Sequence, residues 1–258
     1  MSENIRIYVA SEPGNEKAEK ALHWSVINTS TAPVDIYWMT DKYENSAWQG
    51  WKKRRDTREV NTGTGWKTNF SCFRWAIPEA CKFKGKAIYL DVDQIILKDI
   101  KQMWNLPMDD YWVLSINFKR TDVMLMNCEK FTHEKWPSVK RIKNSGKSQL
   151  QHRKRVQKLG TMGPLSRIYN CLDGDGYNPE VTRLIHYTVM RTQPWHPLPQ
   201  FIKYEPHPVP EVEQLWHEYY NNALAYEKAN NVILGSPEKY DSVPNVIGNI
   251  TSQAAKCE

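Results

Sequence analysis

Two carboxylates that could hold a metal ion stand two residues apart, directly after a short apolar run. Asp91 and Asp93 follow residues 87–90 and precede a second apolar run at 95–97. Side chains at positions i and i+2 of an extended chain lie on the same side, so both carboxylates can reach one cation. Hard divalent cations prefer such oxygen ligands. The pair therefore predicts a divalent-cation site at the end of a strand.

The same spacing also arises by chance, about once in one or two chains of this length. A second Asp-x-Asp triplet stands at 173–175, where its aspartates alternate with glycines. An EF-hand loop starting there is excluded, because Tyr177 and Leu184 stand where oxygen ligands are required. We expect the second triplet to form a turn, whereas apolar flanks hold the first in place.

His186 is the candidate third ligand. It lies near the end of the apolar run 184–187, and Gln193, Pro194 and Trp195 follow shortly after it. A strand would thus deliver an imidazole to the site, with a stiff aromatic turn behind it. A single histidine on a strand is more often structural than metal-binding, so this assignment depends on its occurrence together with the two aspartates.

The order of elements predicts an α/β fold. Residues 5–10 and 35–39 have the apolar character of buried strands, and the segment between them repeats apolar residues at the spacing of one helical face. Such a β-α-β opening is typical of sheets covered by helices. The predicted helical face consists of Ala18, Ala21, Leu22, Ser25 and Val26.

Further strands are expected at 87–90, 111–117, 123–127 and 183–187. Open α/β sheets bind ligands at the carboxyl ends of their strands, which is where the first Asp-x-Asp triplet falls. Two more helical stripes are predicted. They consist of Phe70, Phe73, Ile77 and Cys81 and, near the C-terminus, of Val212, Leu215, Trp216, Tyr219, Tyr220 and Ala223.

The length of 258 residues allows one large domain. We expect a single domain over 1–258 whose C-terminal part, from about 205, forms a helical extension that is frayed after about 242.

No apolar run approaches the roughly 18 residues of a membrane span, and the N-terminus lacks the pattern of a signal peptide. The five cysteines are widely spaced without a C-x-x-C pair, which indicates reduced thiols. These features predict a cytoplasmic protein.

The net charge of +6 is concentrated in segment 135–158, which has nine Lys and Arg residues and no Asp or Glu. We expect an exposed helix there. One interpretation is a solvated helix; the other is a contact surface for an anionic partner, namely an acidic glycan, a membrane surface or nucleic acid. The residues predicted to contact such a partner are Arg153, Lys154 and Arg155.

Taken together, these residues resemble those of the glycosyltransferases of family 8 and their phage and bacterial relatives. The resemblance extends from the first strand to about residue 197 and is carried by four short stretches. These stretches are 7–11, 73–93, 123–128 and 186–195. The second begins with Phe-Arg-Trp and ends with Tyr-Leu-Asp-Val-Asp. The fourth is similar to the family's H-Y/F-x…K-P-W signature. The resemblance implies the GT-A fold, a mixed sheet flanked by helices.

The resemblance also implies an activity. It is that of a metal-dependent glycosyltransferase, which moves a sugar from a nucleoside diphosphate sugar, with UDP-sugars favoured, to a hydroxyl of an acceptor glycan. Asp91, Asp93 and His186 would hold Mn²⁺, or Mg²⁺, since a mixed oxygen and imidazole set suits Mn²⁺ better. Asp122 is the candidate catalytic carboxylate. The residues expected at the donor are Val9, Ala10, Ser11, Arg74, Asp91, Val92, Asp93, Arg191, Gln193 and Trp195.

Three departures from the family pattern fall mainly on the acceptor side. Gln193 replaces the family's lysine before Pro-Trp, so the charge that meets the diphosphate has to come from Arg191, Arg74 or another residue. Residues 120–122 read Arg-Thr-Asp in place of Asn-Ala/Ser-Gly, and 160–164 stand where Asp-Gln-Asp is usual. The identity of the acceptor and the stereochemistry of transfer therefore stay open.

Two other functions fit the basic segment. One is a sugar transferase that acts on hydroxylated bases in DNA, and the other is a nucleic-acid-binding relative that has kept the fold without activity. A separate feature, at 62–68, superficially resembles a phosphate-binding loop but lacks the glycine before lysine and a preceding strand. We expect it to be a flexible loop near the donor.

Overall fold

Strands β1 (Ile5–Ala10), β2 (Val34–Met39) and β3 (Lys86–Asp91) pair in parallel at the centre of a seven-stranded sheet, with β1 in the middle. Helix α1 (Glu16–Thr29) connects β1 to β2, and all five residues of its predicted apolar face are buried. The predicted β-α-β opening is therefore confirmed. The computed structural model describes residues 4–42, 48, 69–145, 149–159, 161–236 and 249–251.

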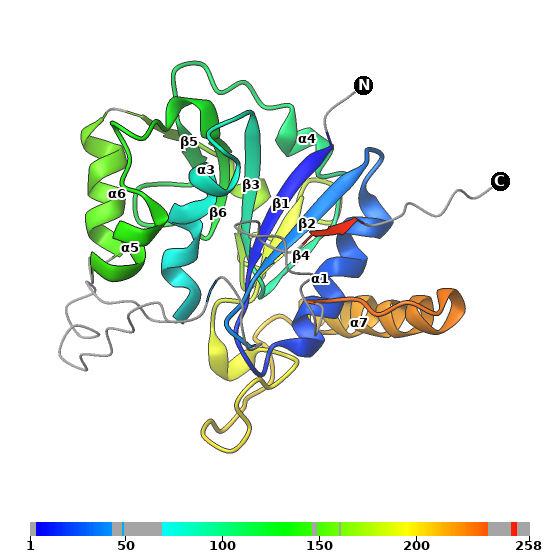
Figure 1. Cartoon of the computed structure of the whole chain (residues 1–258). Helices are drawn as coiled ribbons and strands as arrows, with labels where there is room; N and C mark the ends of the chain where they lie inside the picture. The colour runs from blue at the N-terminus through cyan, green and yellow to red at the C-terminus, as the bar shows by residue number, and fades with distance from the viewer. Residues whose placement is uncertain are drawn as a thin grey trace.

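The other half of the sheet contains antiparallel pairs. Strand β6 (Val123–Asn127) is antiparallel to β3, and β5 (Val113–Ser115) is antiparallel to β6. Strand β7 (Met162–Pro164) then pairs in parallel with β5. The full order is β10-β2-β1-β3-β6-β5-β7 (Figure 1). This arrangement confirms the predicted mixed α/β sheet, although β5 covers only the middle of the strand expected at 111–117.

Strand β10 (Asn249–Thr251) closes the opposite edge by pairing antiparallel with β2. The prediction that the chain is frayed beyond about 242 is wrong for these three residues. The physical reason is that β2 would otherwise present a row of unpaired backbone N–H and C=O groups, which a short returning strand satisfies.

A smaller, three-stranded sheet begins where β3 ends. Strand β4 (Gln94–Ile96) pairs antiparallel with β9 (Leu184–His186), and β8 (Cys171–Leu172) lies parallel to β9. The strand predicted at 183–187 is thus confirmed. The second Asp-x-Asp triplet forms the turn that follows β8, with positive φ angles of 48° at Asp173 and 76° at Gly174. That turn was also predicted.

Alternate side chains of the central strands enter two cores on opposite faces of the large sheet. Ile7 and Val9 pack on the face covered by α1 and α7 (Pro210–Asn230). Tyr8 and Ala10 pack on the other face, under residues of the 3-10 helix η1 (Asn69–Ala76), α5 (Val139–Ser145) and α6 (Gln149–Lys158). Figure 1 shows α1 and α7 well separated from α5 and α6.

The remaining helices are short. The helix expected over 70–81 forms as η1 followed by α3 (Ile77–Ala80), and the basic segment forms α5 and α6, as predicted. The others are α4 (Lys101–Trp104), η2 (Cys128–Lys130), η3 (Arg167–Tyr169) and η4 (Met190–Thr192). Across the described ranges, no helix combines the length and apolar character needed to cross a bilayer.

The C-terminal helix α7 packs against α1 and contributes to the main core. Its buried residues are Val212, Trp216 and Ala223. The Trp216 ring stacks on that of Trp195, with 5.4 Å between the ring centroids. Because this contact joins the predicted C-terminal extension to the segment after β9, we propose that the described parts of the chain unfold as one unit.

Replacing Trp216 tests this coupling. We expect Trp216→Ala to lower the free energy of unfolding of the full chain by about 3–5 kcal/mol, because a buried aromatic side chain is lost and a cavity remains. Urea denaturation followed by circular dichroism measures the change. Leu224→Ala, on the exposed side of the same helix, is the control and should change it by about 0.5 kcal/mol or less. Equal, small effects of the two substitutions would show that α7 is not part of the cooperative core.

Candidate functional site

Asp91 and Asp93 lie at the junction of the two sheets. Asp91 is the last residue of β3, and Gln94, directly after Asp93, begins β4. The residue between the aspartates is also held, since the Val92 N–H donates to the Ala10 carbonyl oxygen over 3.1 Å. Both ends of the triplet are therefore fixed by strand pairing.

His186 reaches the same place from β9. The β4–β9 pairing sets Gln94 opposite His186, and the Tyr187 N–H donates to the Asp93 carbonyl oxygen over 2.9 Å. The imidazole Nε2 lies 3.0 Å from Oδ1 of Asp93. One ligand atom from each of Asp91, Asp93 and His186 lies within 4.8 Å of the others. The structure thus brings together the three residues that the sequence suggested as metal ligands.

The surroundings of Asp93 suit a cation. Its Oδ1 is buried and lies 3.0 Å from the imidazole Nε2 of His186. A buried carboxylate oxygen needs a donor or a positive charge beside it, and a bound cation would supply that charge when Nε2 has lost its proton. Two carboxylates and one imidazole form a donor set that suits Mn²⁺ and is compatible with Mg²⁺. The residues present therefore fit a divalent ion.

Asp122 and Asn170 hold the other nitrogen of the imidazole. Nδ1 of His186 lies 3.0 Å from Asp122 Oδ2 and 3.0 Å from Asn170 Oδ1. The Asn170 amide donates to the same Asp122 oxygen over 3.2 Å. Asp122 stands beside the triplet because it directly precedes β6, and its carbonyl oxygen accepts the Asp91 N–H over 3.2 Å. With a metal ion bound, a proton kept on Nδ1 and shared with Asp122 would leave the Nε2 lone pair free to bind the ion.

The charges in this cluster shift one another's pKa values. Burial favours the neutral imidazole, but the carboxylates of Asp93 and Asp122 outweigh it and raise the pKa of His186 well above its ordinary value. Burial opposes ionisation of Asp122 too, yet the hydrogen bond and charge of His186 hold its pKa far below the usual range. At neutral pH the metal-free cluster therefore contains an imidazolium between two carboxylates.

Arg74 is buried and bonded to the first aspartate. Its Nη2 donates to Asp91 Oδ1 over 3.0 Å, and its Nη1 donates to the Thr121 hydroxyl over 3.2 Å and to the Thr121 carbonyl oxygen. The guanidinium carbon lies 4.4 Å from the ring centroid of Tyr89, whose hydroxyl donates to Asp91. Arg74, which the sequence predicted to contact the donor, therefore binds and orients the Asp91 carboxylate, one of the three proposed metal ligands.

Gln193 and Arg191 occupy different surroundings. The Gln193 amide is buried, donates to the Tyr187 carbonyl oxygen over 2.8 Å and lies 3.5 Å from Asp93 Oδ2. Arg191 is exposed and forms an ion pair with Glu205 over 3.6 Å. The glutamine that replaces the expected lysine therefore contacts the second aspartate itself.

Trp195 and the end of β1 contribute to the walls of this region. The Trp195 indole is buried in the core, and its Nε1 donates to Asn15 Oδ1 over 2.9 Å. At the end of β1, Val9, Ala10 and Ser11 are buried, and Ala10 pairs in register with Asp91. The strand end predicted to face the nucleotide base therefore lies beside the aspartates.

The three residues predicted to contact an anionic partner have different surroundings. Arg153 Nη1 donates to the Lys119 carbonyl oxygen, 2.5 Å away, whereas Arg155 donates through Nε and Nη2 to the Lys135 carbonyl oxygen. Lys154, between them, is exposed. Residues at i and i+2 of a helix point in different directions, so the side chains of Arg153 and Arg155 diverge.

Sequence reasoning missed several residues of the cluster. Tyr89 precedes Asp91 by two positions in a strand, and that spacing was an available signal that it lies on the same side. Asn170 carries no motif that would have identified it, and Thr121 was noted only within the departure from the family pattern at 120–122. The second Asp-x-Asp triplet has a structural role, since the Asp173 carboxylate accepts the Thr188 hydroxyl and the Val189 N–H. The loop at 62–68 lies outside the described residues.

Known proteins resemble the chain weakly in sequence and more extensively in structure. No protein-family model matches it. Protein CDI of Arabidopsis thaliana is 26% identical over 117 residues, which cover 45% of this chain and 42% of that protein. The glycosyltransferase GlyE of Streptococcus pneumoniae TIGR4 has a TM-score of 0.58 at 15% identity, covering 93% of this chain and 66% of GlyE.

Two further solved structures share the same architecture. The galactosyltransferase LgtC, in complex with donor and acceptor sugar analogues, has a TM-score of 0.57 at 14% identity over 84% of this chain and 96% of LgtC. The fold is that of the GT-A glycosyltransferases. The bifunctional glycosyltransferase WbbM has a TM-score of 0.56 at 12% identity over 76% of this chain and 47% of WbbM. The chain spans less than half the length of both Protein CDI and WbbM.

The ionisation of Asp91 provides a test of this geometry. Burial raises the pKa of Asp91 to about 6, with the charge of Arg74 opposing the rise and that of Asp93 adding to it. Arg74→Gln removes the opposing charge, so the pKa of Asp91 should rise above about 6 in the metal-free protein. Carboxyl ¹³C chemical shifts followed by NMR against pH report this titration. An Asp91 that titrates near its ordinary value in the unsubstituted protein would contradict the buried placement.

Proposed function

We propose that the chain is a metal-dependent glycosyltransferase that moves a sugar from a nucleoside diphosphate sugar to a hydroxyl of an acceptor glycan. The observation that carries this proposal is the convergence of Asp91, Asp93 and His186 where the two sheets meet, with one ligand atom of each within 4.8 Å of the others. The GT-A fold supports it. We favour a UDP-sugar as donor and membership of glycosyltransferase family 8, on the motifs at 73–93 and 186–195.

Asp91, Asp93 and His186 would hold the cation, with Mn²⁺ preferred over Mg²⁺ for this mixed donor set. When bound, the ion would neutralise negative charge that develops on the leaving diphosphate. The chain's own residues prepare the site for it. Arg74 and the Tyr89 hydroxyl hold one carboxylate in place, and the strand pairing of β4 with β9 sets the imidazole opposite the other.

We propose that Asp122 positions His186, in place of the catalytic role suggested by the sequence. Its carboxylate accepts the Nδ1 proton and thereby fixes which nitrogen faces the aspartates. Asn170 restrains both groups, since its amide contacts the imidazole and the carboxylate. Histidines that bind metals commonly donate their second N–H to a carboxylate, which orients the ring and raises its basicity.

The donor would lie along the carboxyl ends of β1 and β3, with Val9, Ala10, Ser11 and Val92 near the nucleoside. We propose that Arg191, which is exposed and paired with Glu205, supplies charge to the diphosphate, since Gln193 is neutral.

The structural neighbours give no support to the DNA-acceptor alternative. Turnover of a nucleotide sugar distinguishes an enzyme from the other alternative, a non-catalytic relative. The cytoplasmic location stays a prediction.

Transfer or hydrolysis from a panel of UDP- and GDP-sugars tests the proposed activity. We expect it to require Mn²⁺ or Mg²⁺ and to fall by at least a hundredfold in Asp93→Asn, because that change removes a ligand charge. Product formation is measured by liquid chromatography. Asp175→Asn, in the other Asp-x-Asp triplet, is the matched control and should retain full activity. Equal activity of the two variants would rule out the proposed metal site.

Asp122→Asn separates a positioning role from a catalytic one. If Asp122 orients His186, Mn²⁺ should bind about 10–100-fold more weakly in this variant, because the ring loses its carboxylate partner. Electron paramagnetic resonance of free Mn²⁺ measures this affinity without substrate. Unchanged Mn²⁺ affinity combined with lost turnover would instead restore the catalytic assignment. Asp99→Asn, a distant surface carboxylate in the loop before α4, controls for general charge effects.

A further inference from the structure

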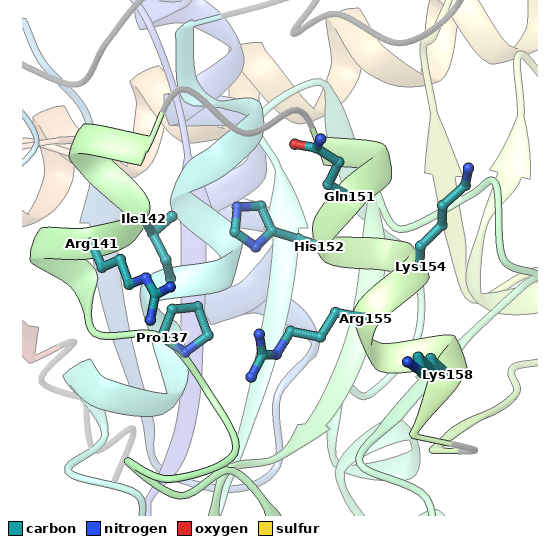
Figure 2. Close-up of a pocket in the computed structure, with 8 residues that line it drawn as sticks. All are labelled: Pro137, Arg141, Ile142, Gln151, His152, Lys154, Arg155 and Lys158. Carbon is teal, nitrogen blue, oxygen red and sulfur yellow. The ribbon is translucent and has the colours of Figure 1, made fainter.

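Helices α5 and α6 enclose a pocket of about 230 Å³, on the face of the large sheet opposite α7 (Figure 2). Four of the side chains that line it are cationic, and the apolar side chains of Pro137 and Ile142 form part of its wall. The cationic residues are Arg141, from α5, and Lys154, Arg155 and Lys158, from α6.

Two guanidinium groups enter this pocket from opposite sides. Figure 2 shows the side chains of Arg141 and Arg155 extending from the two helices toward the space beside Pro137. Arg155 is held in this pose, because its Nε and Nη2 donate to the Lys135 carbonyl oxygen over 3.1 and 2.7 Å. Its guanidinium carbon also lies 6.0 Å from the ring centroid of Trp136. One half of the pair is therefore preorganised, which lowers the entropic cost of binding a ligand.

Among the residues that the structure describes, positive charge predominates around this pair. Segment 135–158, which supplies both helices, contains no Asp or Glu. Glu79 approaches the start of α5, but its Oε2 accepts the Val139 N–H over 2.7 Å and it does not line the pocket. Like charges in one pocket repel each other, so an anion between them would be favourable. Guanidinium groups also match the paired oxygens of phosphate in a bidentate manner.

We propose that the α5–α6 pocket is a binding site for the phosphate group of a phosphorylated sugar. Arg141 and Arg155 bind the phosphate oxygens, Lys154 and Lys158 add positive charge at the rim, and Pro137 and Ile142 contact the apolar face of the sugar ring. The pocket has room for several water-sized groups, which is more than a single phosphate requires. This site is independent of the proposed transferase function, because it uses none of the residues at the sheet junction.

A small concave site accounts for the basic helices better than a nucleic-acid surface does. A duplex backbone needs cations spread along an extended surface, whereas Arg153 turns away toward Lys119 and leaves Arg155 facing α5. The pair that the structure brings together is Arg141 with Arg155, which lie 14 positions apart in the sequence.

Isothermal titration calorimetry of the full chain tests the site, in low-salt buffer without added metal or nucleotide sugar. The probes are glucose 6-phosphate, inorganic phosphate and glucose. We expect glucose 6-phosphate to bind, inorganic phosphate to bind more weakly, and glucose to give no signal. Absence of any phosphate binding would overturn the proposal. Equal affinities for glucose 6-phosphate and inorganic phosphate would show that the site binds the phosphate ion alone. That result would overturn the proposal that the ligand is a phosphorylated sugar.

Substitutions locate the binding. Arg141→Gln and Arg155→Gln should each weaken glucose 6-phosphate binding at least tenfold, whereas Arg167→Gln, an exposed arginine outside the pocket, should not. Arg141 makes no side-chain hydrogen bond or ion pair with the residues that the structure describes, so Arg141→Gln should leave the melting temperature unchanged. Arg155→Lys keeps the positive charge but loses the two parallel N–H donors of the guanidinium group, so it should also weaken binding. Equal affinities in the Arg141 and Arg167 variants would disprove the assignment. Salt-sensitive binding of duplex DNA that Arg153→Gln weakens as much as Arg155→Gln would identify a backbone-contact surface instead.

Discussion

The imidazole of His186, held between the half-buried carboxylate of Asp93 and the buried carboxylate of Asp122, is the interaction on which the candidate site depends. Asp93 lies on one side of the ring and Asp122 on the other, while Arg74 balances Asp91 nearby. Three carboxylates face the imidazolium of His186, the guanidinium of Arg74 and the exposed guanidinium of Arg120, whose Nη1 lies 3.9 Å from Asp122. The Nε2 proton of His186 stands between the ring and Asp93, and a divalent cation that replaced it would bind the ring and the carboxylates together, which is the electrostatic basis for a metal site here.

Hydrogen-bonded strands fix the positions of the residues in this cluster. Asp91 and Asp122 sit at the adjoining ends of two paired strands of the large sheet, and His186 ends a strand of the small one. No member of the cluster is placed by a long loop among the described residues. Side chains mounted on paired strands keep their separations within narrow limits, which a charged site needs because Coulomb energies change steeply at short range.

The sequence predicted the parts of this arrangement that leave local patterns. Short apolar runs identified β1 and β3, a helical periodicity identified α1, and the acidic triplet together with the late histidine identified the candidate metal residues. The hydrogen-bond partners of those residues could not be predicted from the sequence. Asn170, for example, contacts His186 only because the chain packs two segments together that share no motif. Likewise β10 is three residues long, and its pairing follows from an open sheet edge rather than from its own composition.

The β3–β4 junction has a consequence for how this protein can vary over evolution. The first aspartate belongs to one sheet, the second is tied through its carbonyl oxygen to Tyr187, and the intervening Val92 is bonded to β1. Adding or removing one residue there would shift the register of the small sheet and turn its side chains to the opposite face. Amino-acid identity at the middle position can therefore drift among apolar residues, whereas the length of the triplet cannot.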